Sequence, residues 1–352
     1  MGNTPFDSST LKIVDNTDDV PESITERPLG GGSLKVGVLS NPLSGANRKG
    51  LGPVEKVLSG YPQVVHCKVQ TPADIKLALS GFAEQQVDIL AVNAGDGTVH
   101  AVLTVLFNHS PFASLPLLAL LPGGTANMLA KDLGLNGSLE KALQRLLGWA
   151  STGNADPVVE QRAVLQVQAP GFDQPLFGLF FGAGIIYQAI RFFHERVKTW
   201  GLRGRSAQAL IVGRYLLALA AKNRDVVAPV HMDIDLDGKR TDAQQCLLVL
   251  ISTLEKLILG FRPYWGCEEE GPLQFTAVQA HPRHVLRTVL GLACSRGSRH
   301  PGTEHGYLSH NAHQIELDFQ GGFALDGELY MPDAGCGPVM VQKGGPASFL
   351  RL

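Results

Sequence analysis

Cysteine is scarce in this chain of 352 residues and forms no recognisable pattern. The five cysteines are scattered, odd in number and free of any CxxC spacing; they are Cys67, Cys246, Cys267, Cys294 and Cys336. A disulfide framework pairs its cysteines, and a structural zinc site needs closely spaced ligands. The sequence therefore predicts neither, and it favours a reducing, cytoplasmic location.

Long apolar runs are also missing. The longest, residues 207–221, is interrupted by Gln208 and Arg214, whereas a membrane-spanning helix needs about 18 apolar residues. The N-terminus lacks the basic start and apolar core of a signal peptide. We therefore expect any association with a membrane to be peripheral.

An excess of either charge is absent as well. The formal net charge is −2, which gives no reason to expect nucleic acid as a partner. Hydrophobic residues make up 44% and charged residues 18% of the chain, as in globular proteins. The length is sufficient for two ordinary domains. Oligomeric state is left open, a homodimer included.

Three segments differ in pattern. Residues 1–33 are rich in Ser, Thr, Asp, Pro and Gly, which predicts a flexible leader. In residues 34–155 short apolar runs alternate with helical patterns, which predicts an α/β domain with a mostly parallel sheet flanked by helices. The strands expected there are 35–40, 64–69, 88–93 and 115–121, and the helices are 72–86, 98–108 and 138–150, the last with Ser138 as its N-cap.

Residues 156–352 contain strand-like runs separated by turn signals, which predicts an antiparallel β-sandwich domain with inserted helices. The expected strands are 158–168, 176–182, 227–236, 245–252, 273–280 and 313–319. The expected helices are 184–199, 206–222 and 282–293. We leave open whether the last strands return to the first domain.

Glycine-rich turns follow three of the expected strands, at 41–45 (NPLSG), 94–98 (AGDGT) and 122–127 (PGGTAN). The carboxyl ends of parallel strands share one sheet edge, outside which ligands bind. Glycines let the backbone approach an anion, and helices starting near Thr98 and Thr125 would offer unpaired N–H groups. The pattern favours a polyphosphate site over merely tight connections. A Walker A motif is excluded, because Leu51-Gly52 follows the GANRKG segment.

These three turns, followed by Leu325-Asp326-Gly327-Glu328, resemble the diacylglycerol kinase catalytic-domain family. That family includes soluble bacterial lipid kinases, sphingosine kinases and ceramide kinases. The resemblance extends from about Leu34 to the C-terminus. It implies a nucleotide domain, a β-rich lipid domain and an active site in the cleft between them. It also implies transfer of phosphate from ATP, with Mg²⁺, to a hydroxyl of a neutral lipid such as diacylglycerol or ceramide.

The resemblance also implies roles for particular residues. Asp96 matches the acid of the family's GGDGT loop, a base or polariser for the attacking hydroxyl, which phosphoryl transfer requires. The positions implied to contact the nucleotide are Asn41, Ser44, Gly45, Gly95, Gly97, Thr98, Gly124, Thr125 and Asn127.

Two further acids, Asp326 and Glu328, match the family's DGE segment and are implied to be catalytic, with Asp326 as a Mg²⁺ ligand. In an extended segment, side chains two residues apart face the same side, so the pair could point together at Mg²⁺ or at the acceptor hydroxyl. The alternative is a plain hairpin turn, because Asp-Gly is a favoured turn pair.

Two positions depart from the family's pattern. Ala94 replaces the first glycine of GGDGT, at a cost of about 1 kcal/mol if the backbone there has positive φ. Residues 182–187 resemble a segment in which sphingosine kinases carry an aspartate, yet no carboxylate lies between Asp173 and Glu195. An uncharged lipid head group is therefore favoured over a sphingoid base.

Basic and large apolar residues alternate from Arg191 to Arg224, where eight basic residues accompany one acid. Such a mixture suits an anionic membrane surface. The contacts expected there are Trp200, Arg203, Arg205 and Arg214. The alternative is a pair of helices that pack on the sandwich and leave their charges in solvent. Two other functions stay open: a NAD kinase-like enzyme and a catalytically silent lipid-binding or regulatory protein.

Overall fold

The computed structural model describes residues 12–15, 34–109, 111–153, 157–197, 204–220, 223, 226–257, 260–266, 269–283, 288 and 303–352. The chain divides into two compact units. Unit 1 comprises Met1–Arg162 and Pro346–Leu352, and unit 2 comprises Ala163–Gly345. The division lies inside β6 (Val158–Gln168) instead of at residue 155, because this single strand belongs to both units. The last strand, β16 (Val339–Arg351), likewise ends in unit 1.

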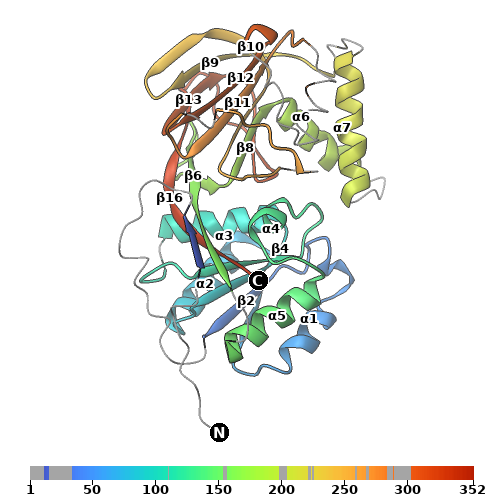
Figure 1. Ribbon diagram of the computed structural model, residues 1–352, viewed down its shortest axis with the longest axis vertical. Coiled ribbons are helices and arrows are strands. Elements are labelled where there is room, and N and C mark those ends of the chain that lie inside the picture. The colour runs from blue at the N-terminus through green and yellow to red at the C-terminus, as the bar shows by residue number, and fades with distance from the viewer. Residues whose placement is uncertain are drawn as a thin grey trace. The chain divides into compact units, whose positions relative to one another are not determined.

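Unit 1 contains a parallel sheet in the order β5-β4-β2-β3, which β16 joins beside β5 (Figure 1). Every residue of its two central strands is buried. Near-continuous apolar runs of this kind are typical of strands covered on both faces. The strands are β2 (Val36–Ser40), β3 (Val65–Lys68), β4 (Ile89–Ala94) and β5 (Leu117–Pro122).

Helices cover both faces of this sheet. Val36 and Val38 pack in a core with α1 and α5, whereas Gly37, which lies between them in the strand, contacts Phe82 of α2. Alternate residues of a strand point to opposite faces, so α5 and α2 lie on opposite sides. The helices are α1 (Gly52–Leu58), α2 (Pro72–Glu84), α3 (Asp96–His109), α4 (Met128–Leu133) and α5 (Leu139–Thr152). The sequence predicted neither α1 nor the true start of α4.

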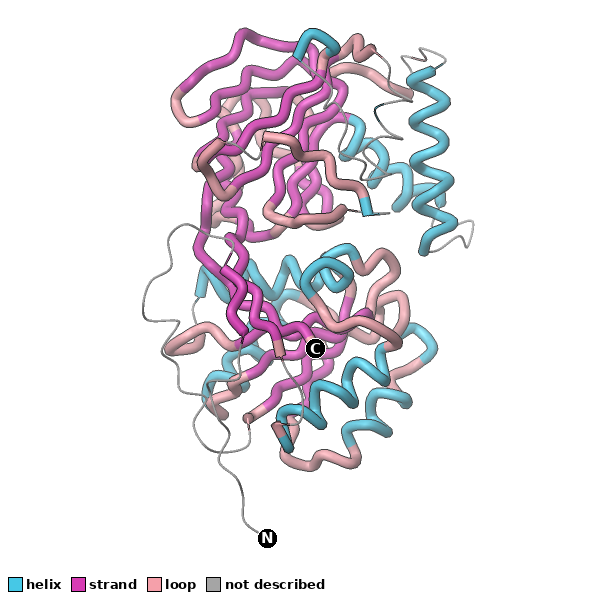
Figure 2. The backbone as a smooth tube through the Cα atoms, in the orientation of Figure 1, coloured by secondary structure: helices cyan, strands magenta, loops and turns pink. Residues whose placement is uncertain are grey.

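Unit 2 is built mainly of antiparallel strands (Figure 2). They run in the order β15-β14-β8-β10-β9-β13, and β11 pairs with β10 and β12. The strands are β7 (Leu176–Gly178), β8 (Phe180–Gly184), β9 (Val230–Leu236), β10 (Lys239–Ser252), β11 (Leu273–Gln279), β12 (Tyr307–Ala312), β13 (Gln314–Phe319), β14 (Phe323–Leu325) and β15 (Glu328–Tyr330). The predicted fold class, parallel α/β followed by antiparallel β with inserted helices, is confirmed.

Two helices stand beside the strands of unit 2. They are α6 (Ile185–Phe192), which continues as a π-helical turn over Phe193–Val197, and α7 (Gly204–Ala220). The third predicted helix, 282–293, lies almost wholly outside the described residues. Among those that are described, no helix is long and apolar enough to cross a membrane.

The prediction of a flexible leader is wrong for four residues. Lys12–Asp15 form a strand, β1, that pairs in parallel with the start of β6. Ile13 and Val14 are β-branched residues that favour strands, a local preference that the polar composition of the segment concealed. The remainder of residues 1–33 lies outside the part of the chain that the structure describes.

Candidate functional site

The three glycine-rich turns of unit 1 pack directly against one another at the carboxyl edge of the parallel sheet. We call residues 41–45 loop 1, residues 94–98 loop 2 and residues 122–127 loop 3. A Cβ added to Gly45 would overlap the Thr125 hydroxyl oxygen, and one added to Gly124 would lie 2.5 Å from the Gly95 Cα. These glycines are therefore needed for the loops to approach each other, whether or not an anion also binds them.

Hydrogen bonds between side chains and backbone lock the loops together. The Gly95 N–H donates to Ser44 Oγ over 3.1 Å, which ties loop 2 to loop 1. Asn41 Nδ2 donates to Thr98 Oγ1 over 2.9 Å, which ties the same two loops a second time. Within loop 3, the Gly124 N–H donates to Asn127 Oδ1 over 2.6 Å. The structure therefore brings the predicted nucleotide-contacting residues of all three loops to one place, with Gly97 in the first turn of α3.

Two buried asparagines beneath loop 1 were missed by sequence reasoning. Asn47 and Asn93 are 2% and 0% exposed. Asn47 Nδ2 lies 2.9 Å from the Asn41 carbonyl oxygen and 3.2 Å from Asn93 Oδ1, and Asn93 Nδ2 donates to Ser40 Oγ over 3.0 Å. Buried amides of this kind are retained only when their hydrogen bonds are satisfied. Asn93 is a polar residue near the end of an otherwise apolar strand, and this feature of the sequence could have identified it.

Asp96 caps a helix that begins in another loop. Its carboxylate accepts the N–H groups of Met128 and Leu129, the first two residues of α4, over 3.0 and 3.1 Å. The first N–H groups of a helix have no partner within the helix, and a carboxylate satisfies them well. We expected α4 to offer these donors to a phosphate; that expectation is wrong, because Asp96 takes them.

The environment of Asp96 suits a proton acceptor. Burial raises the pKa of the Asp96 carboxyl above its ordinary value, while the N–H groups of Met128 and Leu129 and the charge of Lys131 partly oppose this. A base is most effective when its pKa lies near the working pH. Each carboxylate oxygen can accept two hydrogen bonds, so the caps of α4 leave further acceptor capacity on both oxygens.

Ala94 causes no backbone strain. It is the last residue of β4, it is 3% exposed, and it is not among the residues with positive φ. The cost of about 1 kcal/mol, which we expected for a left-handed alanine, therefore does not arise. The replacement of glycine by alanine at this position leaves loop 2 intact.

In unit 2, Asp326 faces the protein interior from a hairpin turn. The residue is 1% exposed, and its carboxylate accepts the N–H groups of Leu179 and Phe180 over 3.0 and 2.9 Å. Asp326 and Gly327 have φ of 49° and 91° and connect β14 to β15, where Leu325 pairs with Glu328. The expectation of an extended segment with both acids on one side is therefore wrong. Asp326 is buried in the turn, whereas Glu328 is exposed on the strand after it.

The described residues do not fit a resident Mg²⁺ site at Asp326. Magnesium requires a near-octahedral shell of oxygens, often completed by water and substrate phosphates. The Asp326 carboxylate is instead directed at two backbone N–H donors. Within the described ranges, no group of three or more His, Cys, Asp or Glu residues could share an ion. A Mg²⁺ ion that arrives on a nucleotide would be part of the substrate.

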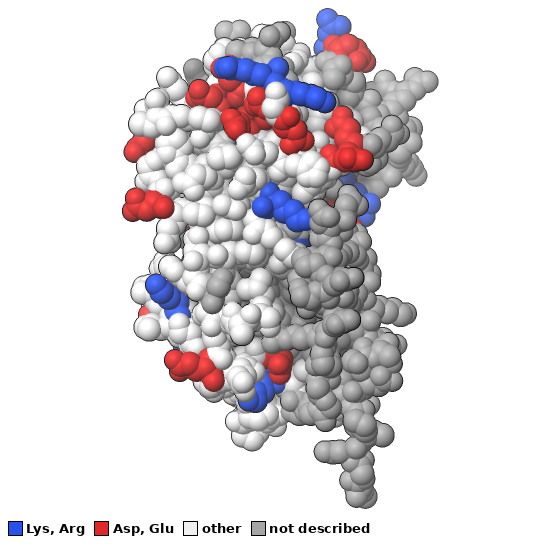
Figure 3. Space-filling view, turned by 90° about the vertical axis from the view of Figure 1, so that its left-hand side faces the viewer, with Lys and Arg blue, Asp and Glu red and all other residues white. Residues whose placement is uncertain are grey.

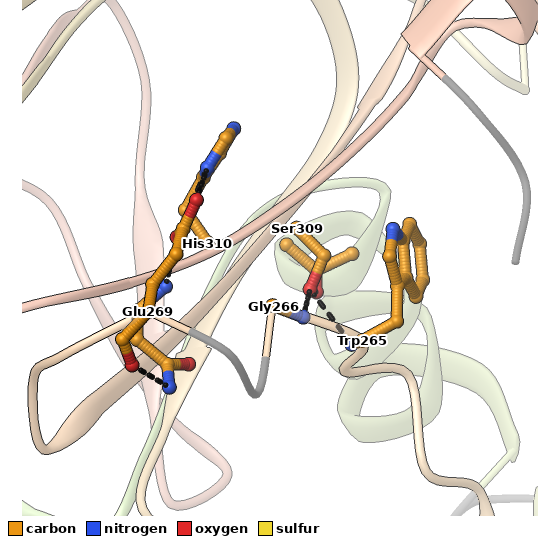
Figure 4. Close-up of polar contacts among 7 residues, drawn as sticks. Trp265, Gly266, Glu269, Ser309 and His310 are labelled. Atoms are coloured by element: carbon orange, nitrogen blue, oxygen red, sulfur yellow. Dashed lines mark hydrogen bonds and ion pairs between the residues drawn. The ribbon is translucent and has the colours of Figure 1, made fainter.

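A second polar cluster in unit 2 serves to hold a segment in place (Figure 4). Ser309 Oγ accepts the N–H groups of Trp265 and Gly266 over 3.0 and 3.3 Å, and His310 Nδ1 lies 2.9 Å from Glu269 Oε1. Ser309 and His310 are neighbours in β12 and point to opposite faces, so they form no relay. The two pairs fasten the segment that precedes β11 onto β12.

The predicted membrane contacts are described only in part. Trp200 and Arg203 lie outside the described residues, and Arg205 belongs to α7 but its side chain is not described. Arg214 is exposed on α7, and its guanidinium lies 4.4 Å from the centre of the Phe192 ring. At this distance the cation is attracted by the face of the ring.

A family model matches the part of the chain that carries the three loops, and two relatives match about a third of the chain. Residues 35–154 match the family model described as "Diacylglycerol kinase catalytic domain". A "Putative lipid kinase" of Streptococcus pneumoniae serotype 4 is 33% identical over 119 residues, which are 32% of this chain and 38% of that protein. A "Probable lipid kinase YegS-like" of Enterobacter sp. strain 638 is 33% identical over 111 residues, 31% of this chain and 37% of that protein. The matches thus span little more than a third of these relatives.

The fold also resembles solved structures. The crystal structures of a "putative diacylglycerol kinase" and of a second diacylglycerol kinase, both from Bacillus anthracis str. Sterne, cover 90% of this chain and 96% of theirs. Their TM-scores are 0.59 and 0.53, and their sequence identities are 20% and 19%. At this level of identity the likeness concerns the fold alone.

The burial of Asp326 predicts that this residue acts chiefly on stability. Asp326→Ala should lower the free energy of unfolding by about 3 kcal/mol, because two buried N–H groups lose their acceptor. Asp326→Asn, which keeps one acceptor oxygen, should cost less. Glu328→Gln is the matched control, and it should change stability by less than about 0.5 kcal/mol because Glu328 is exposed. Urea denaturation of the three variants measures this order. A fully stable Asp326→Ala protein would show that the carboxylate is retained for chemistry instead.

Proposed function

We propose, from the match of residues 35–154 to the diacylglycerol kinase catalytic-domain model, that this chain is an ATP-dependent lipid kinase. It transfers the γ-phosphate to a hydroxyl of a neutral lipid, either diacylglycerol or a ceramide-like lipid. The observation that carries the proposal is the carboxylate of Asp96, held at the meeting point of three interlocked glycine-rich loops.

In this proposal the loops bind the nucleotide and Asp96 accepts the proton of the lipid hydroxyl. The lipid hydroxyl oxygen attacks the γ-phosphorus, the bond from that phosphorus to the bridging oxygen breaks, and ADP leaves. The hydroxyl proton passes to the Asp96 carboxylate. Phosphoryl transfer depends mainly on positioning and charge stabilisation. Loops that are fixed by Ser44, Asn41 and Asn127 are suited to that task, because their geometry is set before the substrate arrives.

An assay with labelled ATP and separate panels of acceptors tests the function. We expect phosphate transfer to diacylglycerol or ceramide presented in mixed micelles and none to NAD. Transfer to NAD alone would favour the NAD kinase-like alternative. Lipid binding without transfer to any acceptor would favour a catalytically silent protein.

Substitution of the proposed base should separate chemistry from folding. Asp96→Asn should lower kcat by about 10²-fold, as expected for loss of a positioned base. It should also reduce stability by about 1 kcal/mol, because an amide oxygen accepts the α4 N–H groups less strongly than a carboxylate does. Steady-state kinetics and thermal unfolding on the same protein measure both. An Asp96→Asn enzyme that keeps most of its kcat would contradict the role.

The pH dependence of kcat tests the role of Asp96 without replacing this residue. The raised pKa of Asp96 predicts an acid limb of kcat above the range of an ordinary aspartate, since the base must lose its proton. Lys131 lowers this pKa, so Lys131→Met should move the limb to higher pH while both caps of α4 remain. A limb unmoved by Lys131→Met would mean that another group governs it.

We propose that α7 brings the enzyme to an anionic membrane. Tyr215 and Ala218 are buried in a core with α6, while Leu210 and Leu217 are 40% and 72% exposed. Arg214 lies between these leucines at helical spacing, so all three share one outward face. Exposed leucines flanking an arginine suit the boundary between head groups and acyl chains.

The distribution of acids within unit 2 agrees with this orientation. Figure 3 shows acidic side chains, with basic ones beside them, gathered on the upper part of one face, where β9 and β13 lie; Arg240 pairs there with Asp233. These two strands place like charges opposite each other, Asp233 with Asp318 and Asp235 with Glu316. In Figure 1, β9 and β13 stand on the side of unit 2 away from α7. An anionic surface would repel the acidic side and leave α7 to meet the lipid.

A matched pair of leucines tests the docking surface. Leu217→Glu on α7 should weaken binding to vesicles of anionic phospholipid by about ten-fold, as expected when a leucine that inserts into the lipid is lost and a like charge is added. Leu77→Glu on α2 is the control, since Leu77 is equally exposed, at 74%, but lies in unit 1. Co-sedimentation at low and high salt measures both variants. Equal losses in the two variants, or no loss in either, would remove α7 from the membrane contact.

A further inference from the structure

A chain of hydrogen bonds connects a histidine on the outer strand of the unit 1 sheet to the nucleotide loops. His66 Nε2, on β3, lies 2.9 Å from Ser40 Oγ, and Ser40 is fully buried at the end of β2. Asn93 Nδ2 donates to the same oxygen over 3.0 Å. Asn47 Nδ2 lies 3.2 Å from Asn93 Oδ1 and 2.9 Å from the carbonyl oxygen of Asn41.

The donors and acceptors along these hydrogen bonds favour one direction. An amide nitrogen only donates, so Ser40 Oγ is an acceptor for Asn93 and must give its own proton to another partner. His66 Nε2 can accept that proton only when the imidazole is neutral, with its proton on Nδ1. Asn47 then donates to Asn93, Asn93 to Ser40, and Ser40 to His66. These donors and acceptors are mutually consistent in this one arrangement.

Protonation of His66 reverses the hydrogen bond between His66 Nε2 and Ser40 Oγ. Both ring nitrogens then donate, so Ser40 Oγ receives two donors and its hydroxyl proton loses its acceptor in a buried position. Ser40 Oγ can still accept from both groups, so the cost lies in the buried hydroxyl proton, and relief of that cost requires Ser40 and Asn93 to reorient. Because Asn47 is bonded both to Asn93 and to the backbone of Asn41, the disturbance reaches loop 1 directly.

We propose that His66 is a positioning residue for nucleotide binding: its neutral imidazole accepts the Ser40 hydroxyl proton and so fixes Asn93, Asn47 and loop 1. The proposal rests on the function proposed above, in that loop 1 binds ATP. It adds a pH-sensitive element, because the arrangement is lost when His66 takes up a proton.

The charges around His66 are consistent with a neutral ring. Burial lowers the pKa of His66, Lys68 on the same strand lowers it further, and Glu55 on α1 raises it. Glu55 and Lys68 form an ion pair of 2.7 Å, so their effects on the ring largely offset each other. A lowered pKa means that the folded state favours the neutral ring. Its contribution to stability is therefore present above the ordinary value of about 6.5 and is lost as the pH falls through the lowered value.

Nucleotide affinity as a function of pH tests the proposal. The affinity of the full chain for a non-hydrolysable ATP analogue should be measured by calorimetry from pH 4.5 to 8, a range that extends below the ordinary histidine value because the pKa of His66 is lowered. The terminal phosphate titrates in the same range, so a reference variant is needed. His66→Gln provides it, because a glutamine side chain can accept the Ser40 proton but does not titrate. Relative to His66→Gln, the wild-type protein should lose about three- to ten-fold in affinity at the acid end, the worth of about one hydrogen bond.

Two further variants complete the set. His66→Leu removes the acceptor and should bind weakly at every pH, with KM for ATP raised and kcat nearly unchanged. His109→Gln is the control, since His109 is exposed at the end of α3 and should follow the wild-type profile. Parallel profiles for the wild type and His66→Gln would overturn the proposal, and so would tight binding by His66→Leu.

Nuclear magnetic resonance separates failure of this inference from failure of the function. Nitrogen shifts of the His66 ring should report a proton on Nδ1 at neutral pH, and the Asn93 and Asn47 amide signals should titrate with His66 but not in His66→Gln. A neutral ring with its proton on Nε2 would refute the chain whatever the protein binds. If these signals behave as expected and the wild type binds no nucleotide at any pH, the kinase proposal fails while the hydrogen-bonded chain stands.

Discussion

The carboxylate of Asp96 joins two helices that begin in different loops, and the geometry of the candidate site depends on it. Asp96 opens α3, yet its oxygens accept the first N–H groups of α4, more than thirty residues further along the chain. Without this acceptor, two N–H groups at the buried start of α4 would have to find other partners, each at a cost of about 1–3 kcal/mol. Loop 3 lies between β5 and α4, so its path is fixed at both ends by the sheet and by Asp96.

The burial of Asp96 has opposite effects on its strength as a base and on the population of its ionised form. Burial raises the pKa of Asp96, which makes the carboxylate a stronger base but favours its protonated form in the folded state. The resulting contribution to stability is present below the ordinary aspartate value and is lost as the pH rises through the raised value. The N–H groups of Met128 and Leu129 reduce that loss, because they bind the ionised form. The contacts that cap α4 thus also keep the base available.

Sequence reasoning succeeded where the signal was local and failed where partners were distant. The buried strands of unit 1 are continuous apolar runs, and the glycine-rich turns follow them directly, so the meeting of the three loops at one sheet edge could be predicted. The role of Asp326 could not, because Asp-Gly fits both an extended acidic pair and a hairpin turn. Its partners, Leu179 and Phe180, lie about 147 residues away in the sequence. Asn47 and Asn93 were missed for a similar reason, since they bond to each other across 46 residues.

The positions of glycine in the loops show whether the packing of the three loops is preserved. Gly45 and Gly124 occupy places where any Cβ would collide with a neighbouring loop, and Gly123 would collide with Asn93 in the same way. The chain keeps glycine at all three. Ala94 occupies a position with ordinary backbone geometry and room for its methyl group in the core, so alanine there carries no penalty. The departure from the GGDGT pattern thus falls where the structure tolerates it, so Ala94 gives no support to the catalytically silent alternative. The crowded glycines are required for the packing of the three loops in either case, and Asp96 is the residue whose retention bears on activity.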